Sequence, residues 1–439
     1  METLKFDLSR NDGKFKIMHA VNNGPAYKRY GGSVPQRNNF EEYKALGIPY
    51  ARNHDASFYD TYGGEHTVDI SAIFPNFDAD ENNPDSYDFV CTDEYIAVTL
   101  LAGTETFYRL GQKIEHTIKK YNIHPPKDFA KWARICEHII RHYNEGWANG
   151  FYYGIKYWEI WNEPDLNYTA TNPVHKATWS GTKEQFFDLY EVAAKHLKSC
   201  FPNLKIGGPA LAFDNAWAQE FLLEMQKRNV PMDFFSWHIY CSKPGMLIAK
   251  SVRMKQYMLD AGYDKAESIL NEWNYVHDWS DTVEAFQNII SSKGATYTMA
   301  CMSAAQYSSI DMLMYYDARP TLWNGLFDRI SLKPIIGYYP FKWFSHFYTN
   351  CERSIKCETS AENIYTLCGI DKNGKASVSV TYYADSEPLP DKEISVDIGR
   401  NGEFEVYYID DEHDPEKAYP IDSLTFTLKH NTAILIKEK

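Results

Sequence analysis

The sequence has no excess of positive charge and no long apolar run. Its 439 residues include 45 Lys and Arg against 59 Asp and Glu, which gives a formal net charge of −14. An acidic surface does not attract nucleic acid or an anionic membrane, so neither partner is expected. No segment reaches the roughly 18 consecutive apolar residues that a membrane-spanning helix needs. The composition therefore argues against nucleic-acid-binding and membrane-spanning proteins.

Familiar metal-binding motifs are also missing. The eight cysteines are scattered without a CxxC pair, and several fall in apolar patterns that are typical of buried free thiols. His19, His66, His116 and His124 show no metal-ligand spacing. The acidic stretch 78–85 lacks the glycine and the closing glutamate of a calcium loop. We expect no metal and no cofactor.

The first ten residues, METLKFDLSR, lack the basic region and the apolar stretch of a signal peptide. The expected location is therefore the cytoplasm, although a leader removed from the natural protein would change that expectation. The sequence leaves the oligomeric state open, and a homo-oligomer is one of the assemblies that it allows.

Aromatic residues, by contrast, are abundant. They make up 15% of the chain, with 11 Trp and 33 Tyr. Aromatic rings build cores and interfaces, and they also stack on the apolar faces of sugar rings. The composition is thus compatible with a carbohydrate ligand but does not establish one.

Short β-rich runs alternate with longer helical patterns from about residue 15 to 345. Eight such units in strict alternation predict a (β/α)8 TIM barrel. The alternative, a doubly wound open sheet, would have a glycine-rich phosphate turn after its first strand, and none is present. The expected strands are 15–22, 49–55, 105–111, 155–162, 204–211, 233–240, 267–274 and 311–317.

Two regions do not fit a simple barrel repeat. Residues 56–104 are long for one connection and predict an additional ribbon or loop over the barrel mouth. After about residue 350 the pattern changes to short alternating strands separated by turn residues, which predicts a small β-sandwich. We therefore expect a barrel over 10–350 and a second module over 351–439, which residues 1–9 join as a further strand.

Polar side chains stand where the predicted barrel strands end, and in barrel enzymes these positions hold the reacting groups. Only two of them are glutamates, at the ends of strands four and seven, 109 positions apart. Two carboxylates facing each other across a cleft are what glycoside hydrolysis requires. The full set is Asn22, Asn23, Arg52, His54, Arg109, Asn162, Glu163, His238, Tyr240, Glu272, Asn274 and Asp317.

Several of these segments are similar to motifs of one enzyme family. The strand-four segment resembles the Asn-Glu-Pro signature of a large clan of barrel glycosidases, and the strand-seven segment resembles that clan's nucleophile segment. Within the clan, the chain most resembles glycoside hydrolase family 39, the β-xylosidase and α-L-iduronidase family, over about residues 10–350. The motifs are VNNGP (21–25), ARNHD (51–55), FYRLG (107–111), WEIWNEPDL (158–166), HIY (238–240) and ILNEWNY (269–275).

The resemblance implies a role for each matching residue. Glu163 would be the general acid/base, Glu272 the nucleophile and Asn162 a ligand of the sugar 2-hydroxyl. Arg52, His54, His238 and Tyr240 would line the sugar site or position the nucleophile. The aromatic residues that precede Glu163 should raise its pKa, as suits an acid, whereas Arg52 and Tyr240 should keep Glu272 ionised. The implied reaction retains the anomeric configuration through a covalent glycosyl-enzyme.

The chain departs from the family pattern in the loop after strand eight. The xylosidases of the family carry an acidic, glycine-rich insertion there, whereas this chain has the compact segment YYDARPTLWNGLFD (315–328). Asp317, Trp323 and Asn324 are expected to contact the sugar instead, and Arg319 could match an acidic substituent. Trp273 stands directly after the expected nucleophile, where the family more often has Phe.

The sequence thus predicts a retaining, exo-acting β-xylosidase that cleaves oligosaccharides. An endo-acting enzyme, or one specific for a uronic acid or for arabinose, is the second interpretation. A catalytically inert carbohydrate-binding relative is the third, and the presence of both glutamates disfavours it.

Overall fold

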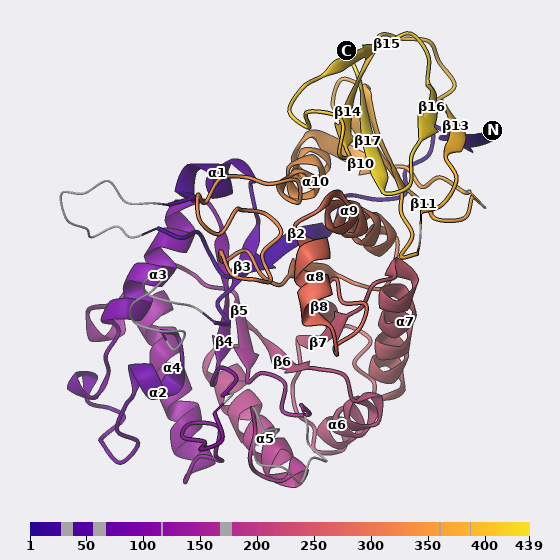
Figure 1. Cartoon of the computed structure of the whole chain (residues 1–439). Helices are drawn as coiled ribbons and strands as arrows, with labels where there is room; N and C mark the ends of the chain where they lie inside the picture. Colours follow the sequence, from indigo (N-terminus) through magenta and orange to yellow (C-terminus); the bar gives the residue numbers. More distant parts are fainter. Residues whose placement is uncertain (28–37, 56–66, 116, 167–177, 360, 387) are drawn as a thin grey trace, which may run out of the picture.

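The computed structural model confirms the barrel (Figure 1). Eight parallel strands close into a ring in sequence order, and the last strand pairs with the first. Every strand overlaps the range expected for it. The strands are β2 Ile17–Asn22, β3 Tyr50–Arg52, β4 Glu105–Leu110, β5 Tyr157–Ile160, β6 Lys205–Leu211, β7 Phe234–Tyr240, β8 Glu267–Asn274 and β9 Met312–Tyr315. The structure describes all residues except 28–37, 56–66, 116, 167–177, 360 and 387.

Helices surround the ring of strands (Figure 1). Their ends follow local sequence signals. In α4, for example, the Asp128 carboxylate accepts the Lys131 backbone N–H at the first turn, and Gly146 ends the helix in the left-handed conformation. The helices are α1 Phe40–Ala45, α2 Ile70–Ile73, α3 Val90–Leu101, α4 Phe129–Glu145, α5 Lys183–Cys200, α6 Asn215–Lys227, α7 Pro244–Asp260, α8 Thr282–Ile289, α9 Ser292–Gln306 and α10 Tyr338–Asn350, with short 3-10 turns η2 Pro84–Ser86 and η3 Trp147–Asn149.

Two local expectations are corrected. The described part of the 56–104 connection contains no strand of a ribbon: it consists of the helices α2 and α3 with an irregular loop between them, while 56–66 lie outside the described residues. The sequence of residues 283–309 has helical periodicity throughout, but the structure divides it into α8 and α9, which meet closely because a side chain is absent at Gly294. A Cβ there would lie 2.3 Å from the Asn288 carbonyl oxygen. His66 and His116 also lie outside the described residues.

The barrel interior has two layers of different chemistry. The layer toward the starts of the strands is apolar and includes Phe107, Tyr157 and Phe234. Above it, side chains on β3, β5 and β7 are polar and fully buried. Alternation along β5 explains the change, because Tyr157 and Glu159 face the interior whereas Trp158 and Ile160 pack in the large outer core toward the helices.

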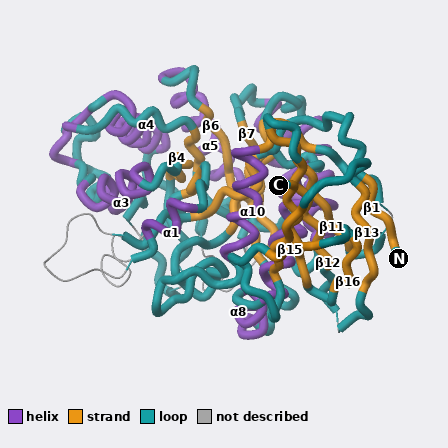
Figure 2. The backbone as a smooth tube through the Cα atoms, turned by 90° about the horizontal axis from the view of Figure 1, so that it is seen from above, coloured by secondary structure: helices purple, strands orange, loops and turns teal. Residues whose placement is uncertain are grey.

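The predicted C-terminal β-sandwich is also present. Its sheets have the orders β1-β13-β16 and β10-β11-β12-β17-β14-β15, and they share a separate apolar core. Figure 2 shows these strands gathered on one side of the molecule together with the N-terminus. The strands are β1 Glu2–Lys5, β10 Cys351–Ser354, β11 Ile364–Asp371, β12 Ala376–Tyr382, β13 Lys392–Asp397, β14 Phe404–Ile409, β15 Tyr419–Ile421, β16 Thr425–Leu428 and β17 Thr432–Glu438.

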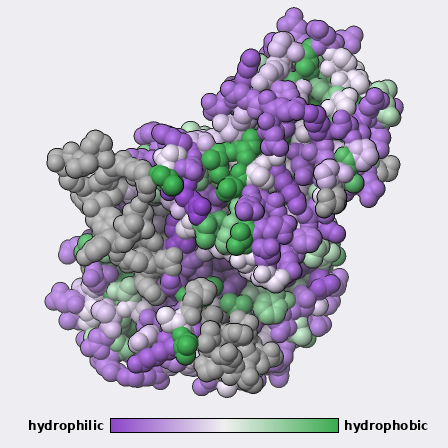
Figure 3. Space-filling model, viewed as in Figure 1, coloured by the Kyte–Doolittle hydropathy of each residue, from purple (hydrophilic) through white to green (hydrophobic). Residues whose placement is uncertain are grey.

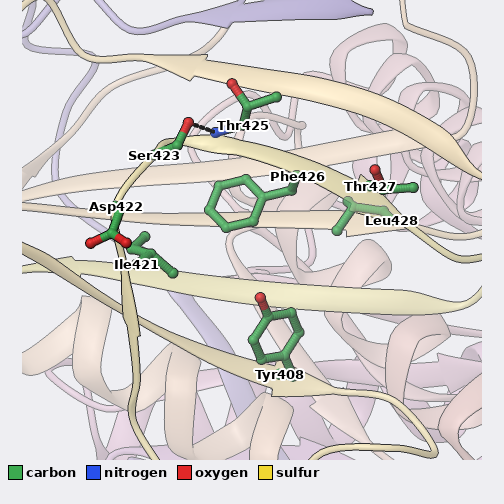
Figure 4. Close-up of a pocket in the computed structure, with 8 residues that line it drawn as sticks. All are labelled: Tyr408, Ile421, Asp422, Ser423, Thr425, Phe426, Thr427 and Leu428. Atoms are coloured by element: carbon green, nitrogen blue, oxygen red, sulfur yellow. Dashed lines mark hydrogen bonds between the residues drawn. The ribbon is translucent and has the colours of Figure 1, made fainter.

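The sandwich has a small cavity of its own, of about 340 Å³ (Figure 4). The rings of Tyr408 on β14 and Phe426 on β16, which belong to different sheets, project toward the space between them. Asp422 supplies the single carboxylate among the lining residues. This cavity therefore lacks the carboxylate pair that the sequence predicts for the reaction.

The surface is mostly hydrophilic on the face shown in Figure 3, with hydrophobic side chains gathered near its centre. Among the described residues, no helix is both long enough and apolar enough to cross a membrane.

Candidate active site

Glu163 and Glu272 stand on opposite sides of the barrel, after β5 and near the end of β8. The chain leaves β5 through an irregular backbone, with φ of 73° at Trp161 and 45° at Glu163. Residues other than glycine seldom adopt these angles, and such strained positions cluster at functional sites. The Glu163 N–H donates to the Ala210 carbonyl at 2.9 Å, which fixes the turn against β6.

The His238 side chain lies between the two carboxyl groups. A 2.7 Å hydrogen bond joins His238 Nδ1 to Glu163 Oε1, and the same nitrogen lies 3.6 Å from Glu272 Oε2. One oxygen of each glutamate and a ring nitrogen of His238 lie within 4.8 Å of one another. Both glutamates are almost completely buried. Two residues distant in sequence thus form a close and largely buried carboxyl pair.

Arg52, on β3, binds Glu272 from inside the barrel. Its Nη1 donates to Glu272 Oε1 at 2.7 Å, its Nη2 to Asn162 Oδ1 at 2.7 Å, and its Nε to Glu159 Oε2 at 2.6 Å. The Tyr240 hydroxyl donates to the other Glu272 oxygen at 2.9 Å. Glu272 therefore receives one donor on each oxygen, and both contacts expected from the sequence are present.

The same network orients Asn162. Arg52 occupies its amide oxygen, whereas the buried Asn162 Nδ2 has no hydrogen-bond partner among the described residues. A buried amide donor without a partner is costly. A hydroxyl group of a ligand next to Glu163 could accept this hydrogen bond, in keeping with the role that the family resemblance implies.

The environment raises the pKa of both glutamates. Burial raises the pKa of Glu163 to about 8, and the nearby charge of Asp165 adds to the rise. Burial raises the pKa of Glu272 to about 7, while His238 and Arg52 oppose that rise. The rise expected for the pKa of Glu163 is found, with burial and Asp165 as its main causes. The raised pKa of Glu272, by contrast, contradicts the expectation that Arg52 and Tyr240 keep it fully ionised. Trp161, expected to contribute, instead packs outward against Trp132 and Trp179.

The two histidines of the site are neutral near pH 7. Burial lowers the pKa of His238 to about 4. Burial and the charge of Arg52 lower the pKa of His54 well below its usual range. His54 Nε2 lies 3.7 Å from Glu272 Oε1, so His54 adjoins the glutamate without a hydrogen bond to it.

A cavity of about 900 Å³ opens onto both glutamates. Its aromatic wall is formed by Tyr240, Trp279, Tyr316 and Trp323, with ring centroids 5.3–6.4 Å apart in five of the pairs. Such a wall can stack on the apolar face of a sugar. The complete lining is His54, Asp55, Lys113, Ile114, Glu163, Leu166, Ala212, Phe213, Ile239, Tyr240, Lys250, Glu272, Trp279, Tyr316, Arg319, Thr321, Leu322 and Trp323.

Two residues predicted to contact the sugar lie behind this cavity. Asp317 is fully buried and accepts hydrogen bonds from the Asn23 side chain and the Arg319 backbone. Asn324 is also fully buried, and its amide bonds to the Ala318 carbonyl within its own loop. Neither residue lines the cavity, so both shape the loop that presents Trp323.

Sequence reasoning missed several residues that complete the site. Glu159 accepts hydrogen bonds from Arg52, Ser236 and Asn271 beneath the glutamates, and its inward place in the alternation of β5 is the signal that could have revealed it. Lys250 and Trp279 come from a helix and a loop, whose directions the sequence pattern does not define. Lys250 Nζ donates to the His238 carbonyl at 2.7 Å.

His238, Glu163 and Glu272 also offer donor atoms that could ligate a divalent cation. Arg52 already contacts the Glu272 carboxylate, and Lys250 lowers the pKa of Glu163 by its charge. These positive groups disfavour a second cation between the glutamates.

Replacing Arg52 with Met should strongly destabilise the fold. It leaves Glu159 and Glu272 buried without their cation, and breaking a buried ion pair in this way costs about 3–5 kcal/mol. The free energy of unfolding from urea denaturation measures the effect. Arg10→Met is the control, since Arg10 forms ion pairs at the surface and its loss should change stability little. Equal effects of the two substitutions would contradict the role given to Arg52.

The fold and the carboxyl pair together are those of the (β/α)8-barrel glycosidases, and comparisons with known proteins narrow the class. The family model for "Glycosyl hydrolases family 39" matches residues 64–281, which include Glu163 and Glu272. A β-xylosidase from Caldicellulosiruptor saccharolyticus is 32% identical over 205 residues. That match covers 44% of this chain and only 37% of the relative's length.

Solved structures share the whole architecture. A glucosidase from Croceicoccus marinus superposes with a TM-score of 0.76 at 20% identity, covering 100% of this chain and 98% of that one. A family 39 β-xylosidase from Caulobacter crescentus has a TM-score of 0.69 at 16% identity, covering 100% of both chains. These likenesses concern the fold alone. The family model places residues 64–281 in glycoside hydrolase family 39, and the relatives found by sequence are named β-xylosidases.

Proposed function

We propose that this protein is a retaining, exo-acting β-glycosidase, and that its preferred substrates are oligosaccharides that end in β-linked xylose. The observation that carries the proposal is the close approach of Glu163 and Glu272, whose nearest described oxygens lie within 4.8 Å. Retaining enzymes hold their carboxyl groups about 5–5.5 Å apart, whereas inverting enzymes need roughly 6.5–9.5 Å to admit a water molecule. The short separation therefore favours direct attack by one carboxylate.

In the first step, a Glu272 oxygen forms a bond to the anomeric carbon as the bond from that carbon to the leaving oxygen breaks. Glu163 gives its proton to the leaving oxygen. In the second step, Glu163 takes a proton from water, the water oxygen bonds to the anomeric carbon, and Glu272 is released. Two inversions give net retention.

The surrounding residues support these roles of Glu163 as the acid/base and Glu272 as the nucleophile. The higher pKa of Glu163 suits a group that must begin protonated. Arg52 and Tyr240 stabilise a negative charge on Glu272. A neutral His238 connects the two carboxyl groups, and Asn162 supplies an amide donor that no described residue occupies. The barrel over 10–350 would contain these residues, with the module over 351–439 and 1–9 as its support.

β-Xylose is proposed because the matched relative is a β-xylosidase. The cavity volume, about 900 Å³, lies within the usual 300–1,000 Å³ of small-molecule pockets, so the cavity is large enough for a sugar unit. Uronic acid is the second candidate, since Lys113, Lys250 and Arg319 all line the cavity. These cations could offset the charge of a substrate carboxylate.

A panel of aryl glycosides tests the proposal. It should contain β-xylose, α-arabinose, β-glucose, β-galactose, β-glucuronate and α-iduronate, and kcat/KM should be highest for the xyloside. Xylo-oligosaccharides should release xylose from the non-reducing end from the start of the reaction. Preference for a uronate would transfer the assignment to the second candidate, and inactivity toward every glycoside would refute both.

The pKa values of the glutamates predict a bell-shaped pH profile. The rate requires Glu272 to be deprotonated and Glu163 to be protonated, so kcat/KM should rise as pH approaches about 7 and fall above about 8. The two limbs belong to the coupled pair. In Glu163→Gln, assayed with an activated aryl leaving group, the alkaline fall should disappear. Its persistence would show that another group causes it.

The C-terminal module should influence substrate affinity through Asp385. This carboxylate bonds to the Tyr275 hydroxyl, His277 and Lys293 of the barrel, at 2.8, 2.5 and 2.8 Å. Trp279, two residues beyond His277, lines the cavity. Releasing this segment should misplace the aromatic wall, so Asp385→Ala should raise KM about fivefold with a smaller effect on kcat.

The matched control is Asp410→Ala, because Asp410 pairs with His413 inside the module and has no hydrogen bond or ion pair with the described part of the barrel. Steady-state kinetics of both variants gives the comparison. Equal KM values for Asp385→Ala and Asp410→Ala would refute the link between the module and the cavity.

A further inference from the structure

A second cluster of metal-ligating side chains lies on the outer helices. Glu137 on α4 faces His196 and Cys200 on α5, and their donor atoms lie within 4.8 Å of one another. His196 Nε2 is 2.6 Å from Glu137 Oε2 and 3.9 Å from Cys200 Sγ. We propose that Glu137, His196 and Cys200 form a binding site for a divalent cation of intermediate softness, with Zn²⁺ as the best-matched ion.

The ligand types and their spacing support this choice. His196 and Cys200 are four residues apart on one helix, so both side chains extend from the same face. An imidazole nitrogen, a thiolate and a carboxylate oxygen are common zinc ligands. A tetrahedral ion with bond lengths of about 2.0–2.3 Å keeps its ligand atoms roughly 3.3–3.7 Å apart. The sulfur and nitrogen atoms already have nearly this separation, and the Glu137 oxygen must withdraw by about 0.8 Å.

The Glu137 carboxylate is oriented for such a role. Arg141 donates to its Oε1 at 2.8 Å, which leaves Oε2 directed at His196. Partners of this kind, behind the ligands, fix ligand orientation in metal sites. The three ligands are only partly buried, so an ion can enter from solvent and keep a water molecule in its fourth position.

The cluster is remote from the carboxyl pair. Cys200 is the last residue of α5, and β6 begins at Lys205, so the cluster adjoins the starts of the barrel strands. Glu163 and Glu272 lie at the opposite ends of the strands. An ion bound here would join α4 to α5 and stabilise the barrel without entering the reaction.

Cobalt(II) is the probe, because a tetrahedral cobalt–thiolate site gives visible d–d bands and a near-ultraviolet charge-transfer band. The full-length protein, freed of metal by chelation, should show both, and one equivalent of Zn²⁺ should remove them. Cys200→Ser should lose the charge-transfer band. Because His196 is a ligand itself, His196→Ala should weaken Zn²⁺ binding by at least the 10–100-fold that is lost when a residue hydrogen-bonded to a ligand is removed. Cys91→Ser, which changes another partly buried thiol, should bind as the unaltered protein does.

Each other outcome overturns the site. Cobalt spectra without a thiolate band, or unchanged in Cys200→Ser, would exclude Cys200. Binding abolished by His238→Ala but retained in His196→Ala would place the ion between the catalytic glutamates instead. Circular dichroism of the metal-free variants checks that they are folded. If Cys200→Ser or His196→Ala does not fold, the variant of the two that does fold decides the test. Zn²⁺ should then raise the Tm of the unaltered protein and of Cys91→Ser but not the Tm of that variant.

Discussion

Glu272→Ala is expected to abolish the hydrolysis of aryl β-xylosides, lowering kcat by at least about 10⁴-fold. The substitution removes the atom that attacks the anomeric carbon, and His238 and Tyr240 cannot replace it. The alanine variant also removes the acceptor of the Tyr240 hydroxyl and one of the acceptors of Arg52. Steady-state kinetics with a nitrophenyl xyloside measures the loss.

Azide identifies the cause of that loss. A small anion in the space left by the carboxylate can attack the anomeric carbon, and the product should be the α-glycosyl azide of inverted configuration. Glu267→Ala is the control, because Glu267 begins the same strand and pairs with Lys205 at the far end of the barrel. Normal turnover by Glu272→Ala, or azide products from Glu267→Ala alone, would refute the assignment of Glu272.

Glu163→Ala should lower the rate by about 10²–10⁴-fold for substrates with poor leaving groups. The departing oxygen then leaves without a proton, so natural xylosides should be affected most. Activated aryl xylosides need little protonation, and their first step should remain comparatively fast. Pre-steady-state kinetics should show a burst of phenol followed by slow turnover, because the second step also lacks its base.

The leaving group serves as the internal control for this prediction. Azide should accelerate the second step of Glu163→Ala and give the β-glycosyl azide, opposite in configuration to the product from Glu272→Ala. An equal loss of rate for good and poor leaving groups would contradict a role for Glu163 as the acid.

The barrel and the positions of both glutamates could be predicted because they depend on local patterns. Each strand is an apolar run bounded by turn residues, and parallel strands in a barrel bring their ends to one rim. A glutamate at such an end has few structural uses, so Glu163 and Glu272 could be paired across 109 positions of sequence.

The residues that surround the glutamates and shape the cavity could not be predicted in the same way. Glu159 lies inside a strand, where its role depends on meeting Arg52 from β3 and Ser236 from β7. Trp279 reaches the cavity on a segment held by the C-terminal module. Asn324, conversely, has the chemistry of a sugar ligand but uses its amide to close its own loop. Such roles depend on contacts between distant segments.

The most direct measurement is trapping of the covalent intermediate. A 2-deoxy-2-fluoro-β-xyloside with an activated leaving group slows the second step more than departure of the aglycone, so the glycosyl-enzyme should accumulate. Mass spectrometry of the digested protein should find one fluoroxylosyl group on the peptide that contains Glu272, and turnover of the unmodified xyloside should give the β-anomer first. An adduct on another residue, or an α-anomer as the first product without any adduct, would contradict the mechanism.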